Sequence, residues 1–263
     1  MNCWSLLVEN EPQKGSYNMA VDDYLFESLA KKSQTVVRFY SWKKPTVSIG
    51  CSQDIKQVLN LEFCRKNSID IVRRITGGKL VLHFKEVTYS ICSSDVQTFT
   101  SSLSKSYQLI SKSLVRGLND MGIPAYLAEG NQEAYSRSSL PCFSYPAQNE
   151  IKVKEKKIVG SAQKRTGGIF IQHGSIPLIS DDQLLRSISL LEQKNEKVRM
   201  ISVSQALGKG IEYSMLVPYL TSGIQKFFGI QFRVMQLAAE EKKQIRIIQK
   251  ERHENPKWVF EAE

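Results

Sequence analysis

The sequence has few of the residues from which metal sites and disulfide frameworks are built. It contains three histidines, and its acidic residues form no ligand-like cluster. No C-x-x-C pair occurs among its five cysteines, which are widely separated: Cys3, Cys51, Cys64, Cys92 and Cys142. We therefore expect no metal ion and no disulfide framework. Cysteine usage of this kind is typical of the reducing cytoplasm, where we expect the protein to be located.

Long apolar segments are also missing. The first apolar run, over residues 4–8, ends at Glu9 and is too short for a signal peptide. No segment reaches the ~20 apolar residues of a membrane span, so we expect no membrane partner. The sequence contains no internal repeat, low-complexity stretch or linker, and it predicts one domain over residues 1–263.

The charge balance is basic, with 36 Lys and Arg residues against 26 Asp and Glu residues and a formal net charge of +10. A basic surface attracts nucleic acid, anionic lipid, nucleotides or an acidic protein. The basic residues are scattered and form no consecutive block of the kind found in nucleic-acid-binding tails. We therefore expect an acidic protein or an anionic small molecule as the partner, and no nucleic acid.

The N-terminal pattern predicts a strand over residues 3–8 and a helix over residues 18–32. Asn18 is the expected N-cap of this helix, whose apolar side chains recur at helical spacing. Asp22 and Asp23 lie in the first turns, where the helix dipole favours acidic residues. We expect this helix to pack on the core and to carry no chemistry.

The following segments predict two pairs of strands. Residues 36–42 and 46–49 are rich in β-branched and aromatic side chains, and the Lys-Lys-Pro turn between them predicts a hairpin. Strands over residues 69–72 and 80–83 flank a second hairpin turn, and another strand follows over residues 87–92.

The second hairpin turn is a candidate binding loop. It contains Thr76-Gly77-Gly78, whose adjacent glycines let backbone N–H groups point at an anion or a carbonyl oxygen. Arg73 and Arg74 precede the glycines and Lys79 follows them, so the loop is cationic. Most Gly-Gly hairpins are merely turns, but the flanking charge predicts a site for a phosphate, a carboxylate or an acyl carbonyl.

The stretch from Cys142 to Ser175 combines a thiol, a lysine and a glycine-containing turn. A polar loop over residues 129–141 leads to Cys142, and a strand over residues 149–154 ends at the tight turn Glu155-Lys156 before Lys157. A cysteine nucleophile needs a nearby group that stabilises the thiolate and moves a proton, and a lysine does both. Taken singly, a cysteine is more often a small buried apolar residue and a lysine a solvated one. Only the combination predicts Cys142 and Lys157 as catalytic residues.

The remaining pattern alternates helices and strands and predicts a mixed α+β fold of the α/β class. Asp181 and Ser202 are expected N-caps of short helices. We expect the C-terminal helices, over about residues 181–263, to form an appendage. The further helices are predicted over about 54–67, 101–121, 212–228 and 238–252, the last of them solvated, and the further strands over 169–171, 175–178 and 231–235.

The motifs resemble those of the biotin/lipoate protein ligase and lipoyl(octanoyl) transferase superfamily. The resemblance covers about residues 5–180, and it implies a catalytic domain with mixed sheets flanked by helices and no accessory lipoate ligase domain. It rests on Arg73-Arg74-Ile75-Thr76-Gly77-Gly78 leading into Val81-Leu82-His83, on Lys157-Ile158-Val159-Gly160-Ser161-Ala162-Gln163, and on Gln172-His173-Gly174-Ser175. Earlier blocks match as well: Asn18-Met19-Ala20-Val21-Asp22, Arg38-Phe39-Tyr40-Ser41-Trp42 and Ser48-Ile49-Gly50, with a weaker echo at Lys257-Trp258.

More than one chemistry occurs in this superfamily. Its lipoate–protein ligases use ATP and magnesium, whereas its octanoyltransferases take octanoate from acyl carrier protein through an acyl-cysteine. Cys142, followed by Phe143 and placed before Lys157, resembles the cysteine of octanoyltransferases of the LipM type. Lys79 stands where the ligases tend to have a third glycine, and Phe84 where the family usually has aspartate. The resemblance therefore implies an octanoyltransferase that needs no ATP, metal or other cofactor.

The implied donor is octanoyl-acyl carrier protein, and the implied acceptor is a lysine of a lipoyl domain or of glycine cleavage H protein. An ATP-dependent lipoate ligase and an amidotransferase between lipoyl-type proteins remain alternatives, and a non-enzymatic binding module is the least favoured. We expect a monomer in which His83 and His173 orient loops by hydrogen bonds. The resemblance implies these substrate-binding residues: Arg73, Arg74, Thr76, Gly77, Gly78, Lys79, His83, Gly160, Ser161, Gln163, His173 and Gly174.

Overall fold

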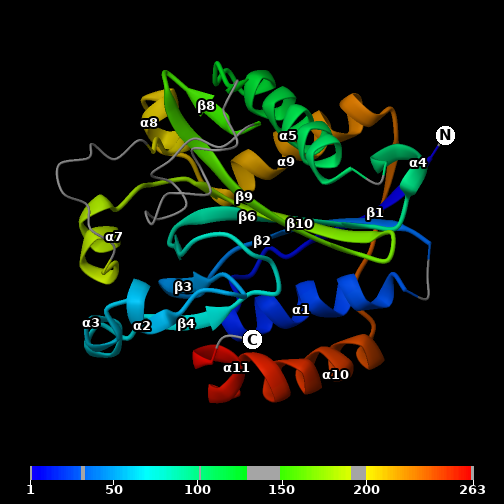
Figure 1. The fold of residues 1–263 in the computed structure, drawn as a ribbon. Coiled ribbons are helices and arrows are strands. Elements are labelled where there is room, and N and C mark those ends of the chain that lie inside the picture. The colour runs from blue at the N-terminus through cyan, green and yellow to red at the C-terminus, as the bar shows by residue number, and fades with distance from the viewer. Residues whose placement is uncertain (1, 31–32, 101, 129–148, 191–199, 262–263) are drawn as a thin grey trace.

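An eight-stranded mixed sheet runs through the centre of the protein (Figure 1). The computed structural model describes residues 2–30, 33–100, 102–128, 149–190 and 200–261. In spatial order the strands are β11 (Gln231–Val234), β1 (Cys3–Val8), β2 (Thr35–Tyr40), β6 (Glu86–Ser93), β10 (Ile169–Pro177), β9 (Lys156–Thr166), β8 (Ile151–Val153) and β7 (Tyr126–Leu127).

The pairing within this sheet changes direction at β2. β1 is parallel to both β11 and β2, and the sheet is antiparallel from β2 onward. Every residue of β2 and β6 is buried, because helices cover both faces of the sheet. The polar side chains of these strands, among them Arg38 of β2 and Glu86, Thr88 and Ser90 of β6, are therefore buried as well.

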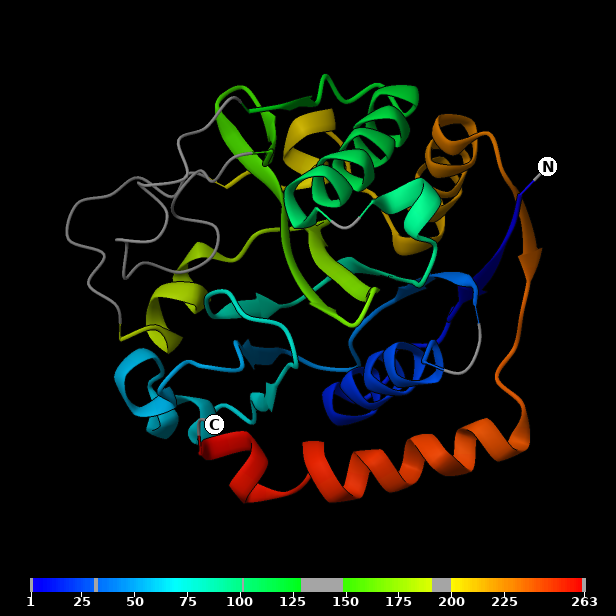
Figure 2. The ribbon, with the colours of Figure 1, turned by 45° about the vertical axis from the view of Figure 1, so that its right-hand side comes forward.

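Helices form a layer on each face of the sheet. α5 (Leu103–Asp120) and α9 (Tyr213–Phe228) pack together on one face, and α1 (Gly15–Ser28) lies on the other. Outside α1 run α10 (Ala239–Ile248), the π-helical turn η1 (Gln249–His253) and α11 (Pro256–Phe260), as Figure 2 shows. The short helices are α2 (Ile55–Val58), α3 (Leu61–Lys66), α4 (Val96–Phe99), α7 (Asp182–Ile188) and α8 (Val203–Leu207).

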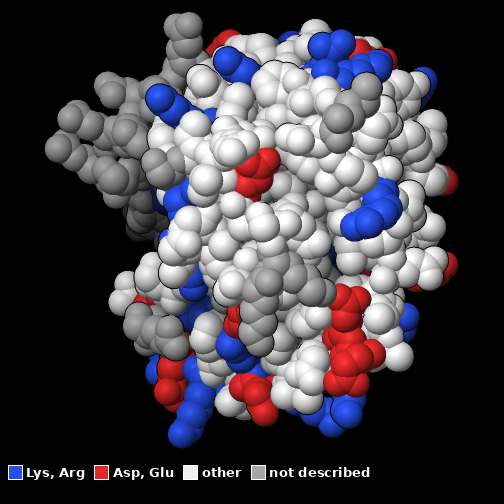
Figure 3. All heavy atoms as spheres, turned by 90° about the vertical axis from the view of Figure 1, so that its right-hand side faces the viewer, with Lys and Arg blue, Asp and Glu red and all other residues white. Residues whose placement is uncertain are grey.

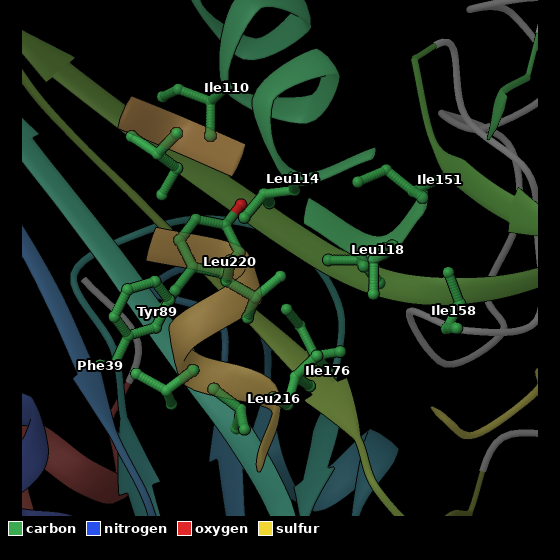
Figure 4. Close-up of a cluster of buried hydrophobic side chains, with 14 of the residues drawn as sticks. Phe39, Tyr89, Ile110, Leu114, Leu118, Ile151, Ile158, Ile176, Leu216 and Leu220 are labelled. Atoms are coloured by element: carbon green, nitrogen blue, oxygen red, sulfur yellow. The ribbon is translucent and has the colours of Figure 1, made fainter. Parts of the chain in front are cut away.

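The main core lies between the central sheet and the α5–α9 pair. Its side chains meet in one cluster (Figure 4), whose labelled members are Phe39, Tyr89, Ile110, Leu114, Leu118, Ile151, Ile158, Ile176, Leu216 and Leu220. The two helices approach each other closely at glycines. A Cβ atom on Gly223 would lie 2.4 Å from the backbone nitrogen of Gly117, so neither position has room for a side chain.

A smaller three-stranded sheet lies beside the first and corrects two predictions. Its order is β4 (Asp70–Arg73), β3 (Thr46–Ile49) and β5 (Val81–His83). β2 and β3 therefore belong to different sheets, and the predicted hairpin between them is wrong. β4 and β5 both pair with β3 and not with each other, so the Gly77-Gly78 stretch is a crossover loop instead of a hairpin turn.

Three local predictions are also corrected. α1 begins at Gly15 with Lys14 as its N-cap, and Asn18 lies buried inside the helix, where its side chain donates to the Ser41 carbonyl. Gly160 lies within the continuous strand β9 and not in a turn. The strands predicted over residues 169–171 and 175–178 form the single strand β10 because both of its edges are paired along its length.

Other predicted elements are confirmed at nearly their expected bounds. The structure confirms the strands β1 and β11 and the helices α5 and α9, and α9 ends at Gly229 in the left-handed conformation. Asp181 and Ser202 cap α7 and α8 through hydrogen bonds to backbone N–H groups. The turn into β9 is made by Lys154 and Glu155, both with positive φ, one residue earlier than predicted.

The C-terminal segment contributes to both layers of the molecule. β11 forms the edge strand beside β1, and α9 packs against α5, so both elements pack on the N-terminal part of the chain. α10, predicted as solvated, buries Ile245 against α1. Within the described part of the chain, no helix is long and apolar enough to cross a membrane. Basic and acidic side chains are scattered over the face shown in Figure 3.

Candidate active site

Two motifs that lie far apart in the sequence meet in one small pocket between the two sheets. It is lined on one side by residues of the β3–β5 region and on the other by residues of β9 and β10. Apolar side chains of Met19, Val81 and Ala162 contribute to the lining. Six predicted substrate-binding residues border the pocket: Arg74, His83, Gly160, Ser161, His173 and Gly174.

Asp22 is the centre of a buried polar network beside this pocket. Its carboxylate accepts hydrogen bonds from Arg38 Nη1 at 2.7 Å, Tyr40 Oη at 2.9 Å and Ser90 Oγ at 2.8 Å. Burial alone would raise the pKa of Asp22, but the Arg38 guanidinium and the bond to His173 outweigh it and lower the pKa below its ordinary value. The aspartate that the sequence assigns to the helix dipole is therefore part of the site's framework.

His173 connects this network to the glycine loop. Its Nδ1 lies 3.0 Å from Asp22 Oδ2, and its Nε2 lies 2.7 Å from Thr76 Oγ1. Thr76, which opens the Gly77-Gly78 loop, is completely buried. The histidine thus holds the loop against β10, which is the orienting role expected for it.

His83 is held in the same way at the other end of the pocket. Its Nδ1 lies 2.8 Å from Glu86 Oε1, and its Nε2 lies 2.8 Å from Ser48 Oγ. The imidazole stacks on the ring of Trp42 with their centroids 3.9 Å apart. Glu86 also accepts from Ser175 Oγ at 2.6 Å, so it joins β10 to β5.

Arg73 and Arg74 are buried under the glycine loop, with 2% and 4% of their surface exposed. Arg74 Nη2 donates to the carbonyls of Gly77 at 3.0 Å and Lys79 at 2.7 Å. Arg73 Nη1 donates to the carbonyls of Gly50, Cys51 and Gln53. Both guanidinium groups therefore fix the backbone around the loop, and their contact with a substrate anion stays a prediction.

The glycine loop is tightly packed on one side and open on the other. A Cβ atom on Gly50 would lie 2.1 Å from the Gly78 carbonyl oxygen, so Gly50 is required for the loop to approach. Gly78 has a positive φ of 92°, which favours glycine. Nothing lies within 4 Å of a Cβ built on Gly77, so the loop has open space at this residue.

Ser161 and Gln163 make contacts on the core side of β9. Ser161 Oγ lies 2.8 Å from Tyr89 Oη, and Gln163 Nε2 donates to Gln172 Oε1 at 3.0 Å. Gln172 in turn donates to Tyr89 Oη at 3.0 Å. These contacts hold β9, β10 and β6 in register beneath the pocket, and Gln163 does not border the pocket.

Lys157 lies on β9, three residues before Gly160, and only 4% of its surface is exposed. Its Nζ forms an ion pair with the equally buried carboxylate of Glu150. Glu150 was not among the residues predicted from the sequence, because a single glutamate before a strand forms no recognisable pattern. Cys142 and the loop over residues 129–141 lie outside the described residues, so the distance between Cys142 and Lys157 stays untested.

The fold is like that of lipoate protein ligases. The structure is similar to that of a bi-partite lipoate protein ligase from Thermoplasma acidophilum, with a TM-score of 0.83 at 19% identity over 100% of this chain and 98% of that one. Its TM-score with lipoate-protein ligase A bound with ATP is also 0.83, at 21% identity and 100% coverage of both chains. The predicted fold class is confirmed.

Sequence similarity gives the family. Residues 14–225 match the lipoyl protein ligase A/B catalytic domain, and the chain belongs to this family. It is 34% identical to "Octanoyltransferase LipM" of Clostridioides difficile over 243 residues, which cover 88% of this chain and 89% of the relative. It is 32% identical to the protein of the same name from Halalkalibacterium halodurans over 99% of each chain.

Proposed function

We propose that the protein is an octanoyltransferase of lipoate biosynthesis. It moves an octanoyl group from octanoyl-acyl carrier protein to a lysine of a lipoyl domain or of glycine cleavage H protein. The observation that carries this proposal is the similarity, over most of the chain, to several relatives named Octanoyltransferase LipM.

In the first step the Cys142 thiolate attacks the thioester carbonyl of the donor. A C–S bond forms to Cys142, the C–S bond to phosphopantetheine breaks, and the released thiolate takes up a proton. A free cysteine has a pKa of about 8.5, so a neighbouring ammonium group raises its thiolate fraction. We assign this role to Lys157. One thioester replaces another of similar energy, so the step consumes no ATP.

In the second step the amine of the acceptor lysine attacks the carbonyl carbon of acyl-Cys142. A C–N bond forms, the C–S bond breaks, and the electron pair returns to the sulfur. The acceptor amine is mostly protonated at neutral pH, so it loses one proton before attack and a second as the amide forms. Neutral Lys157 accepts the first of these protons and the departing Cys142 sulfur accepts the second.

The pocket between the sheets supports these assignments. Its apolar lining by Met19, Val81 and Ala162 suits a hydrocarbon chain, whose burial contributes ~0.8 kcal/mol per CH₂. The glycine loop lies outside this lining, and the open space beside Gly77 leaves room there for a carbonyl oxygen. A well-placed backbone N–H donor stabilises the transition state by about 3 kcal/mol. Arg74, which borders the pocket, gives this side its positive charge.

Intact-mass measurement after mixing the protein with octanoyl-acyl carrier protein, without ATP, tests the proposal. We expect the wild type to gain the mass of one octanoyl group and Cys142→Ser to gain none. An equal gain in Cys142→Ser would assign the nucleophile to another residue. Pyrophosphate exchange driven by octanoate or lipoate would instead identify an ATP-dependent ligase, and transfer from an octanoylated lipoyl-type protein alone would identify an amidotransferase.

Lys157→Ala tests the proton-transfer role separately. We expect a loss of turnover of at least ~100-fold, because general acid–base groups typically contribute 10²–10⁴-fold. The far-ultraviolet circular dichroism spectrum should remain that of the wild type. Full activity in this variant would contradict the mechanism. A cytoplasmic location, a monomeric state and the absence of any cofactor stay predictions.

A further inference from the structure

The buried ion pair between Glu150 and Lys157 extends the site beyond the residues predicted from the sequence. Glu150 lies directly before β8 and Lys157 near the start of β9, so the pair joins the two strands of one hairpin. Both side chains are almost fully inaccessible, at 2% for Glu150 and 4% for Lys157. We propose that Glu150 is a positioning residue that holds Lys157 in its protonated form and thereby sets the pH range in which the acyl group is transferred. This inference rests on the catalytic role proposed above for Lys157.

An irregularity in the hairpin places the Lys157 side chain inside. Lys152 pairs with Lys157, but Ile151 pairs with Val159, so β9 has one extra residue, Ile158, at this point. A bulge of this kind changes the direction in which the neighbouring side chains point and is common beside active sites. The two paired lysines have different environments. Lys152 forms an ion pair with the exposed Glu155, whereas Lys157 forms a buried ion pair with Glu150.

The Lys157 backbone is fixed on both of its edges. On one edge it pairs with Lys152 of β8, and on the other its carbonyl accepts a hydrogen bond from the Ile201 amide at 2.9 Å. The freedom that remains to Lys157 is therefore mainly in its side chain. A carboxylate at hydrogen-bond distance from Nζ then decides where that side chain points and which protonation state it favours.

The energetic argument follows from burial. An isolated buried ammonium group is costly, and burial alone favours the neutral amine. An opposite charge within hydrogen-bond distance reverses this preference and favours the ammonium form. Removing the Glu150 charge while keeping its shape should therefore make Lys157 lose its proton at a lower pH.

This balance matters because the two half-reactions need opposite forms of Lys157. The ammonium form stabilises the cysteine thiolate that receives the acyl group, and the neutral form accepts a proton from the incoming amine. Glu150 favours the first form, so the transfer step in the wild type should become faster as the pH rises. Without the carboxylate, the same rise in transfer rate should occur at a lower pH.

Glu150→Gln is the direct test, and Glu155→Gln is its matched control. The control removes an equal charge from the same hairpin, at a glutamate that is 81% exposed and contacts Lys152 instead of Lys157. The titration of Lys157 is followed by NMR of ¹³Cε-labelled lysine, with the signal assigned by its loss in Lys157→Arg. Transfer is followed in single turnovers from pre-formed acyl-enzyme to a lipoyl domain between pH 6 and pH 10.

We expect Glu150→Gln to move both the Lys157 titration and the transfer profile by one or more pH units to lower pH, in keeping with shifts of about 1–3 units for a close opposite charge. Glu155→Gln should leave both unchanged, and Glu150→Asp should move them less than Glu150→Gln. If Glu150→Gln does not fold, Glu150→Asp replaces it as the test variant. An unchanged Lys157 titration in Glu150→Asp then overturns the inference.

The outcomes separate this inference from the proposed function. An unchanged Lys157 titration in folded Glu150→Gln overturns the role of Glu150, whatever the activity. A shifted titration together with an unchanged transfer profile shows that the pair exists but does not set the pH range, and this also overturns the inference. A failure of the wild type to form an octanoyl adduct overturns the proposed function, while the NMR titration still reports on the ion pair.

Discussion

At the scale of single residues, buried acids organise the site. Asp22 holds Arg38, Tyr40, Ser90 and His173, while Glu86 holds His83, Trp42 and Ser175. Each carboxylate accepts hydrogen bonds from several buried side chains, and charge-assisted bonds of this kind are stronger than neutral ones. Loss of one acid would leave several buried donors without a partner.

Asp22→Asn should therefore lower the free energy of unfolding at neutral pH by about 3–5 kcal/mol, the usual cost of breaking a buried ion pair. The pKa of Asp22 is lower in the folded state than its unfolded value of 3.8. The ionised carboxylate therefore stabilises the fold above pH 3.8, and this contribution to the free energy of unfolding is lost as the pH falls through the folded pKa. Urea unfolding should thus show the gap between wild type and variant closing below about pH 3.8.

A matched control for this prediction is Glu62→Gln. Glu62 forms an exposed ion pair with Lys66, and such pairs contribute little. We expect its free energy of unfolding to stay within about 1 kcal/mol of the wild type at neutral pH. A gap between wild type and Asp22→Asn that stays constant down to pH 2 would contradict the assigned pKa direction.

At the scale of helices and strands, the existence of elements was predictable and their partners were not. α5, α9 and β11 follow from periodicity, caps and β-branched residues, all of which are local signals. The separation of β2 from β3 depends on pairing with β6 and β4, which lie far along the chain. The Lys-Lys-Pro turn is compatible with either arrangement, so the sequence between the two strands contains no signal that distinguishes them.

In the site, too, local sequence motifs were predictable and contacts between distant residues were not. The glycine loop and the Gln172-His173-Gly174-Ser175 segment were recognisable because each concentrates unusual residues in a short stretch. Asp22 was predicted only as a helix-dipole residue, since Arg38 and His173 approach it from β2 and β10 in three dimensions. Glu150 could not be predicted because its ion pair with Lys157 depends on the pairing of β8 with β9, which a single glutamate before a strand does not indicate.

The α5–α9 contact gives a prediction at this scale. Gly223→Ala places a Cβ atom 2.4 Å from the Gly117 backbone, so the helices must separate. We expect a loss of about 1–3 kcal/mol in the free energy of unfolding, measured by urea denaturation. Gly210→Ala is the control, because nothing lies within 4 Å of its Cβ position, and it should change stability by less than about 0.5 kcal/mol. Equal effects of the two substitutions would contradict the proposed close approach.

At the scale of the whole molecule, the C-terminal helix α11 contributes to the framework of the site. Arg73 Nε donates to the carbonyls of Trp258 and Val259, each at 3.1 Å, and Trp258 Nε1 donates to the Arg73 carbonyl at 3.3 Å. The same guanidinium binds the carbonyls of Gly50 and Cys51. α11 is thus connected, through one arginine, to the backbone that supports the glycine loop.

Removal of residues 255–263 should therefore destabilise more than the C-terminus alone. Hydrogen bonds to a charged group contribute about 1.5–3 kcal/mol each, so we expect a loss of about 3 kcal/mol or more in the free energy of unfolding. Amide hydrogen exchange should also increase in residues 50–53 and 76–79. Phe260→Ala, which trims a side chain that is 42% exposed, serves as the control and should change neither quantity appreciably. Unchanged exchange in the loop after truncation would contradict the connection.

The order of strands in the central sheet has a consequence for synthesis. β1 is synthesised before the other strands of this sheet, and one of its edges pairs with β11. Cys3 and Gln231 are register partners in this pairing, so the partner residue is synthesised 228 positions later. Until then one edge of β1 presents unpaired amide and carbonyl groups, which invite pairing with other chains. A nascent chain that stalls before β11 should therefore aggregate or depend on a chaperone, whereas a completed chain covers that edge itself.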